Sequence, residues 1–101
     1  MLQNTSVILE SATPTTILTV ADGYEVAIVS IEINGGANGG RVQLVKKLGE
    51  DTVFTTGTVS ILTNDYVCVD SRIFLSAGMS LIAQSDSSGI VVSVSYDNSE
   101  V

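Results

Sequence analysis

The chain has 101 residues, of which 45% are apolar and only 15% are charged, and this length allows one hydrophobic core but not two domains. Four Lys and Arg residues against eleven Asp and Glu residues give a net charge of −7, which repels phosphate backbones and argues against nucleic-acid binding. Histidine is absent, so the commonest general base and the usual zinc ligand are missing.

Short runs rich in Val, Ile, Leu and Thr alternate with turn residues, a pattern typical of an all-β sandwich. Residues 1–5 are expected to be loose, and the first predicted strand covers residues 6–10. A loop with Pro14 follows, and then a strand at residues 16–20. Asp22-Gly23 predicts a β-hairpin with a type I′ turn, which needs positive φ at both central residues.

The third predicted strand covers residues 24–34, and its apolar positions change parity along the way. They are even-numbered up to Ile28 and odd-numbered from Val29 onward. Either a bulge lies near these two residues or the strand is buried on both faces.

Residues 34–40 form a flexible glycine-rich loop. A phosphate-binding loop needs a helix N-terminus after it, whereas a strand with alternating apolar residues follows here at 41–48. The loop is therefore interpreted as a connection only. Lys46 and Lys47, adjacent on that strand, point to opposite faces and do not make a basic patch.

The second half of the chain continues with short strands. After a turn at residues 49–51, residues 52–62 give one long strand or two short ones broken at Gly57. Further strands are predicted at residues 66–69, 72–75 and 79–84. Residues 85–89 predict the last hairpin.

The final predicted strand shows the clearest alternation, and the tail at 98–101 is expected to be loose. Its inward residues are Ile90, Val92, Val94 and Tyr96. No stretch has a 3.6-residue apolar period. We therefore expect residues 1–101 to form one β-sandwich of about eight strands, with jelly-roll or Greek-key connections and little or no helix.

An enzyme without histidine must rely on carboxylates, and two pairs of them are candidates. Asp65 and Asp70 flank one short strand, and Glu25 and Glu32 lie on another. Each fits a turn or a solvent-exposed position more simply. We predict no enzymatic activity and assign no catalytic residue, cofactor or metal.

A calcium site would need several oxygen ligands to converge, and four aspartates in or beside turns are candidates. They are Asp65, Asp70, Asp86 and Asp97. Their spacing is not that of a dedicated calcium loop. We favour aspartates that stabilise turns through backbone hydrogen bonds.

Cys68 is the one cysteine, so no intrachain disulfide forms, and its place between two valines predicts a buried or half-buried residue. Phe74 and Tyr96 are expected in the core. Tyr24 and Tyr66 each follow a turn, where exposure would suit them to carbohydrate binding together with the Gly/Asn loop.

Several segments together resemble small bacteriophage virion proteins of the β-sandwich type. They are the strand at 16–20 closed by Asp22-Gly23, Asn34 at the end of the next strand, residues 75–78 leading to 81–83, and the closing residues 92–96. The similarity covers most of the chain and contains no functional motif.

The resemblance implies a structural protein of the phage particle, most simply a capsid decoration (cement) protein made in the host cytoplasm and carried on the virion. Its expected partners are the major capsid protein or neck and tail proteins, and its own copies in a homo-oligomer, expected to be a trimer. No nucleic-acid partner is expected, for the reason of charge given above. No membrane partner is expected either, since no apolar run reaches membrane-spanning length. A neck or tail accessory protein and a carbohydrate-binding sandwich remain alternatives.

Overall fold

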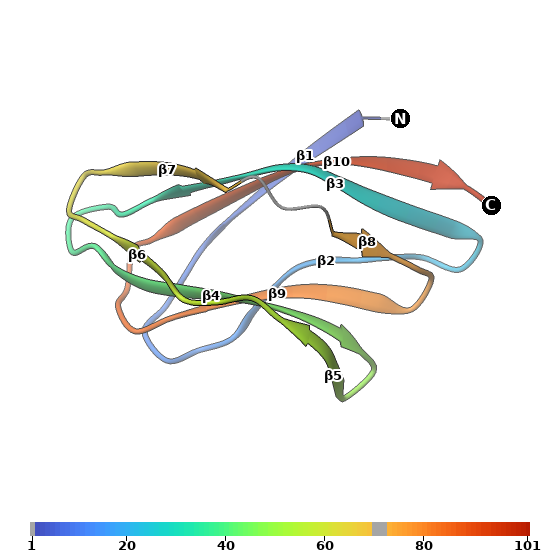
Figure 1. The fold of residues 1–101 in the computed structure, drawn as a ribbon, viewed down its shortest axis with the longest axis horizontal. Coiled ribbons are helices and arrows are strands. Elements are labelled where there is room, and N and C mark those ends of the chain that lie inside the picture. Colours follow the sequence, from blue (N-terminus) through green and yellow to red (C-terminus); the bar gives the residue numbers. More distant parts are fainter. Residues whose placement is uncertain (1, 70–72) are drawn as a thin grey trace.

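The computed structural model describes residues 2–69 and 73–101. Within these ranges, ten strands form two five-stranded antiparallel sheets that pack face to face (Figure 1). The same ranges contain no helix that could span a membrane. The strands are β1 (Leu2–Ile8), β2 (Thr15–Thr19), β3 (Tyr24–Asn34), β4 (Gly40–Leu48), β5 (Asp51–Thr55), β6 (Val59–Ile61), β7 (Tyr66–Val69), β8 (Phe74–Leu75), β9 (Met79–Ser85) and β10 (Val91–Glu100).

The chain passes from one sheet to the other at most of its connections. One sheet has the order β1-β10-β3-β7 with β8 also on β3, and the other has the order β2-β9-β4-β5 with β6 also on β4. This is the strand order of a jelly roll, which confirms the predicted fold class. The described residues hold ten strands rather than about eight, because the edge partners of β3 and β4 are each in two pieces.

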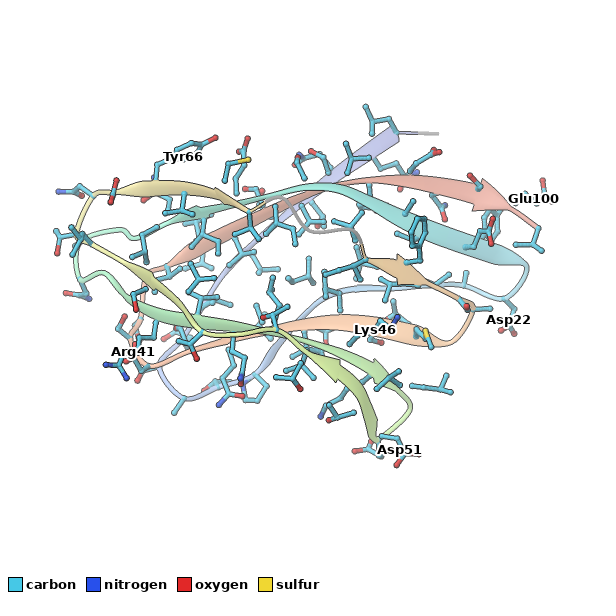
Figure 2. The ribbon with its side chains drawn as sticks, in the orientation of Figure 1. Asp22, Arg41, Lys46, Asp51, Tyr66 and Glu100 are labelled. Atoms are coloured by element: carbon cyan, nitrogen blue, oxygen red, sulfur yellow. The ribbon has the colours of Figure 1, made fainter. Side chains whose placement is uncertain are left out.

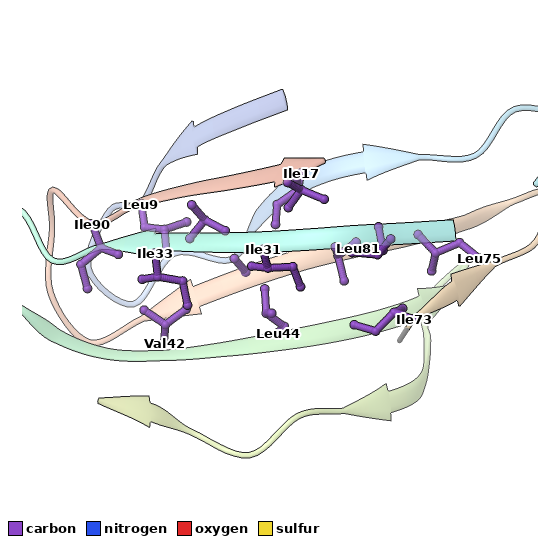
Figure 3. Close-up of a cluster of buried hydrophobic side chains, with 14 of the residues drawn as sticks. Leu9, Ile17, Ile31, Ile33, Val42, Leu44, Ile73, Leu75, Leu81 and Ile90 are labelled. Atoms are coloured by element: carbon purple, nitrogen blue, oxygen red, sulfur yellow. The ribbon is translucent and has the colours of Figure 1, made fainter. Parts of the chain in front are cut away.

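The core lies between the two sheets and is supplied by alternate residues of most of the strands (Figure 3). Val92 and Val94 of β10 and Ile31 and Ile33 of β3 are fully buried, as is Leu81 of the opposite sheet. The predicted inward positions of these strands are confirmed. Burial of such aliphatic side chains, at about 25 cal/mol per Å², is the main force that holds the sheets together.

Val29 is the bulge residue of β3. Ser30 pairs with Ser95 and Ile28 pairs with Tyr96, so Val29 has no partner on β10. Its side chain is 55% exposed, whereas that of Ile28 is buried. The bulge alternative is therefore correct, and β3 is not buried on both faces.

The Asp22-Gly23 turn does not close a hairpin, and that prediction is wrong. β2 pairs with β9 and β3 pairs with β10, so the turn carries the chain between sheets. The N–H of Tyr24 donates to the carbonyl of Ala21 at 3.2 Å, and Gly23 has a φ of 84° while Asp22 has no positive φ. One positive φ at the third residue defines a type II turn rather than type I′.

The predicted hairpin at residues 85–89 is wrong for the same reason. β9 and β10 lie in different sheets, so this segment also crosses the sandwich. The N–H of Gly89 donates to the carbonyl of Leu9, and the N–H of Leu9 donates to the carbonyl of Ile90. The segment is thus held by residues that follow β1.

Both ends of the described chain are paired, so the prediction of loose ends is wrong there. Residues 2–5 belong to β1 and pair with β10, and residues 98–100 pair with β3. The N–H of Val101 donates to the carbonyl of Gly23 at 2.8 Å. The partners of residues 2–5 lie about 90 residues away in sequence, and those of residues 98–100 lie more than 70 residues away. Local sequence patterns do not reveal such distant pairing.

The strand predicted at residues 6–10 lies earlier in the chain, as β1 (Leu2–Ile8), and the other remaining strand predictions agree with the structure where it describes them. Residues 52–62 form two short strands, β5 and β6, which both pair with β4. β7 has the predicted bounds, and the inward side of β9 carries Met79, Leu81 and Ala83. The strand predicted at 72–75 lies partly outside the described residues, which show β8.

Candidate functional site

The surface of the sheet β1-β10-β3-β7/β8 that points away from the core is called the outer face below. Antiparallel register arranges its side chains in rows across the strands. One row contains Ile8, Val91, Asn34 and Tyr66. The next row contains Ser6, Ser93, Glu32 and Cys68. Figure 2 shows Tyr66 on the far side of this sheet from the core.

Tyr66 and Glu32 interact on the outer face. A hydrogen bond between the Tyr66 hydroxyl and the Glu32 carboxylate, together with the negative charge of Glu32, raises the pKa of Tyr66 above its ordinary value of 10.0. With Asn34, Val91 and Ser93 they line a shallow depression of about 240 Å³. The depression therefore combines an aromatic ring with a carboxylate and an amide.

Phe74 lies at the other end of the outer face and is 68% exposed, so its predicted place in the core is wrong. β8 has only two residues, and Leu75 takes the inward position. Phe74 lines a second depression, of about 320 Å³, with Glu25, Ala27 and Asp97 among its neighbours. Aromatic and acidic side chains thus occur together at both ends of this face.

Cys68 is exposed, which contradicts the predicted buried or half-buried position. Val67 and Val69 pack against the core, and strand alternation turns the residue between them outward. A short apolar run does not say which of its residues face inward. Tyr96 packs against the core as predicted, and its hydroxyl donates to Oε1 of Gln3 at 2.8 Å.

Tyr24 and Tyr66, the two tyrosines considered for carbohydrate binding, are both exposed but lie far apart. Tyr24 begins β3, and Tyr66 pairs with Asn34 at the end of the same strand. Ten strand residues separate these positions by about 33 Å. A single sugar ring therefore contacts only one of them. Tyr66 shares its depression with Glu32 and Asn34, and Tyr24 lines another with Gln3 and Asn98.

Asp65 and Asp86 both accept backbone hydrogen bonds. Oδ1 of Asp65 accepts from the N–H of Tyr66 at 2.8 Å, and Oδ1 of Asp86 accepts from the N–H of Arg41 at 2.8 Å. The bond of Asp65 is local and has the turn-stabilising role favoured from the sequence, whereas the bond of Asp86 ties its connection to strand β4, 45 residues away in sequence. The described parts of the chain contain no cluster of three or more Cys, Asp or Glu side chains arranged to hold a metal ion.

Of the two carboxylate pairs considered from the sequence, the structure describes both members only of Glu25 and Glu32, and these do not come together. Glu25 and Glu32 lie seven positions apart on β3, about 20 Å, so they do not face each other across a cleft. Asp97 lies within β10 rather than in a turn. Asp70 lies outside the described residues.

The glycine-rich loop at 34–40 packs closely against two other connections. The amides of Gly35, Gly36 and Gly39 donate to the carbonyl of Asp65, to Oδ1 of Asn34 and to the carbonyl of Gly35. Strand β4 follows the loop. The interpretation as a connection is confirmed, and its hydrogen bonds restrain it more than its glycine content suggests.

Lys46 and Lys47 point to opposite faces of β4, as predicted. Lys46 pairs with the buried Leu81, and its Nζ donates to the carbonyl of Phe74 in the opposite sheet at 2.9 Å (Figure 2). Lys47 pairs with Ser80 and faces away from the core. Lys46 thus links the two sheets, and because Lys47 points the other way the two lysines form no basic patch.

Comparison of the sequence with protein-family models and with curated proteins gives no significant match. The fold and the outer face are therefore the features that bear on function.

Proposed function

We propose that the chain is a non-enzymatic structural protein of a bacteriophage particle, most simply a capsid decoration (cement) protein that binds other virion proteins as a homo-oligomer. Jelly rolls are common in capsid proteins, although a fold alone does not decide a function. The observation that carries the proposal is the apolar content of the outer face.

Five large apolar side chains are exposed on this one face, in a chain with few charges. They are Leu2, Ile8, Val29, Tyr66 and Phe74. Protein interfaces are enriched in aromatic residues and depleted of charge at their centre, and exposed apolar patches often mark such contacts. A partner protein that covers these side chains removes them from water.

The charge of the chain supports a protein partner over packaged DNA. The net charge is −7, and Glu25, Glu32 and Asp97 lie on the outer face beside its aromatic residues. Such a surface repels phosphates and favours a neutral or basic protein surface.

The proposal is tested with purified particles of the source phage. We expect mass spectrometry to detect the chain in the particles and purified chain to bind particles that lack it. Tyr66→Asp and Phe74→Asp should each lower this binding about tenfold or more, because buried aromatic anchors dominate interfaces. Leu62→Asp is the control, since Leu62 is more exposed than either aromatic residue but lies in a loop after β6.

Absence of the chain from particles, or normal binding by both outer-face variants, contradicts the proposal. Immunogold labelling separates its two forms. Label over the capsid surface supports a decoration protein, whereas label confined to the neck or tail supports an accessory protein there.

The depression at Tyr66 favours a second candidate function, carbohydrate binding. An aromatic ring next to the carboxylate of Glu32 and the amide of Asn34 provides a stacking platform with polar groups beside it. We expect a glycan array to give hits that Tyr66→Ala abolishes and Tyr24→Ala leaves intact. An array without hits removes this candidate.

A further inference from the structure

The two sheets present four edges, and three of them carry features that prevent pairing with another strand. The edge of β7 and β8 consists of pieces of four and two residues. The edge of β5 and β6 is also in two pieces, and its register with β4 shifts between Lys46 and Lys47. β2 has five residues, and its register with β9 shifts between Thr16 and Leu18.

β1 forms the fourth edge and lacks all of these features. It is seven residues long and contains no charge, proline or glycine. All seven residues pair with β10 without a register shift. Its backbone groups on the side away from β10 therefore form a regular, uninterrupted edge.

The side chains of β1 are self-complementary in an antiparallel pair. One register pairs all seven residues of β1 with those of a second β1, and Thr5 lies at its centre opposite Thr5 of the other copy. In this register Leu2 faces Ile8, and both are exposed on the outer face, at 68% and 65%. Asn4 faces Ser6 in the same way, so on the outer face apolar meets apolar and polar meets polar, while on the inner face Gln3 lies opposite Val7.

We propose that β1 pairs with β1 of a second copy about a two-fold axis, which joins the five-stranded sheets of two chains into one continuous sheet. The occupant is a second copy because the register is self-complementary. It also avoids bringing carboxylates together in a chain that carries a net charge of −7. The inference puts a two-fold self-contact in place of the trimer expected from the resemblance, and it rests on the proposed function.

Charge substitutions on β1 test the pairing. Asn4→Lys with Ser6→Lys places lysine opposite lysine in this register, and Asn4→Glu with Ser6→Glu places glutamate opposite glutamate. We expect wild type to be a dimer of twice 10.5 kDa by multi-angle light scattering and both double variants to be monomers. An equimolar mixture of the two variants should restore the dimer.

The control carries the same charge on another edge. Thr16→Lys with Thr19→Lys modifies exposed residues of β2 and should leave the dimer intact. Circular dichroism establishes that each variant is folded. A wild-type monomer at all concentrations, a trimer, or a dimer that survives the lysine pair at Asn4 and Ser6 overturns the proposal.

A cross-link tests the register itself in a Cys68→Ser background. Thr5→Cys places two sulfurs across the two-fold axis, where Cα atoms about 4.5–5.5 Å apart suit a disulfide. Gln3→Cys faces Val7 of the other copy, and its two sulfur-bearing positions lie about 13 Å apart. We expect oxidation to link the first variant and not the second, and equal yields overturn the register.

Failure of this inference is distinguishable from failure of the proposed function. A monomer that binds phage particles overturns β1 pairing and the homo-oligomeric state, and leaves the role in binding other virion proteins. A β1-linked dimer that is absent from particles overturns the proposed function and leaves β1 pairing.

Discussion

Gly35 and Gly57 both lie in connections between strands, but their surroundings differ. A Cβ atom at Gly35 would overlap the carbonyl oxygen of Leu62, whereas nothing lies within 4 Å of one at Gly57. We predict that Gly35→Ala lowers the free energy of unfolding by about 1–3 kcal/mol, the usual cost of overpacking. Gly57→Ala should be neutral or stabilising by up to about 1 kcal/mol, because it restricts the unfolded chain.

Equilibrium unfolding in urea measures both changes. Wild-type stability in Gly35→Ala would contradict the close approach of residues 34–40 to the 62–65 connection. Loss of stability in Gly57→Ala would show that this second glycine is also confined.

Tyr66 should titrate at a pH that depends on Glu32. The hydrogen bond and charge of Glu32 raise the pKa of Tyr66 in the folded protein. A raised pKa means that this contact stabilises the fold below pH 10 and that the contribution is lost as pH rises through the folded-state pKa. We predict that Glu32→Gln lowers the pKa of Tyr66 toward 10.0, measured from its Cζ chemical shift.

Glu25→Gln is the matched control for this titration. Glu25 lies on the same strand, about 20 Å from Glu32, and should leave the pKa of Tyr66 unchanged. The same pKa in Glu32→Gln and in wild type contradicts the contact.

At the scale of the element, the bulge in β3 makes a prediction about single-residue deletions. Removing Val29 turns the ladder with β10 into a regular one and keeps Ile28 and Ile31 facing inward. Removing Glu32 instead reverses the direction of Ile33. We predict that the Val29 deletion folds, whereas the Glu32 deletion loses at least about 2 kcal/mol from exposure of a buried isoleucine.

Urea unfolding and circular dichroism compare the two deletions. They shorten β3 by the same amount, so each serves as the control for the other. Equal losses of stability would mean that Val29 is not a removable insertion in the ladder.

At the scale of the whole molecule, charge should govern the strength of self-association. Each chain carries a net charge of −7, and the β1 edge contains no ionic group. Salt screens the repulsion between copies and removes no attraction at this edge. We predict that the dissociation constant of the dimer decreases when the NaCl concentration is raised from 0.05 M to 0.5 M. Sedimentation equilibrium measures this change. Weaker association at high salt would indicate an interface held by ion pairs.

Much of the fold follows from local patterns. The alternation of Val92 and Val94 predicts correctly which side chains face the core. The parity change at Ile28 and Val29 locates the irregularity, and the structure decides between its two interpretations in favour of a bulge. Such patterns record whether each residue contacts water or the interior, and that is a property of single positions along a strand.

The candidate surface is less accessible from the sequence. Cys68 and Phe74 lie in short apolar runs, and local order does not decide which member of such a run points outward. The row that places Ile8 beside Tyr66 also depends on the pairing of β1, β10, β3 and β7. No spacing within the sequence encodes that row.

The sequence alone determined that this is an all-β chain and, on strands with clear alternation such as β10, which side chains face the core. Tertiary structure decided which strands pair. Asp22-Gly23 has the composition of a hairpin turn, yet β2 and β3 belong to different sheets, and the chain ends are held by distant strands. The physical reason is that a turn sets only a local bend, whereas pairing depends on the burial of both sheets against each other.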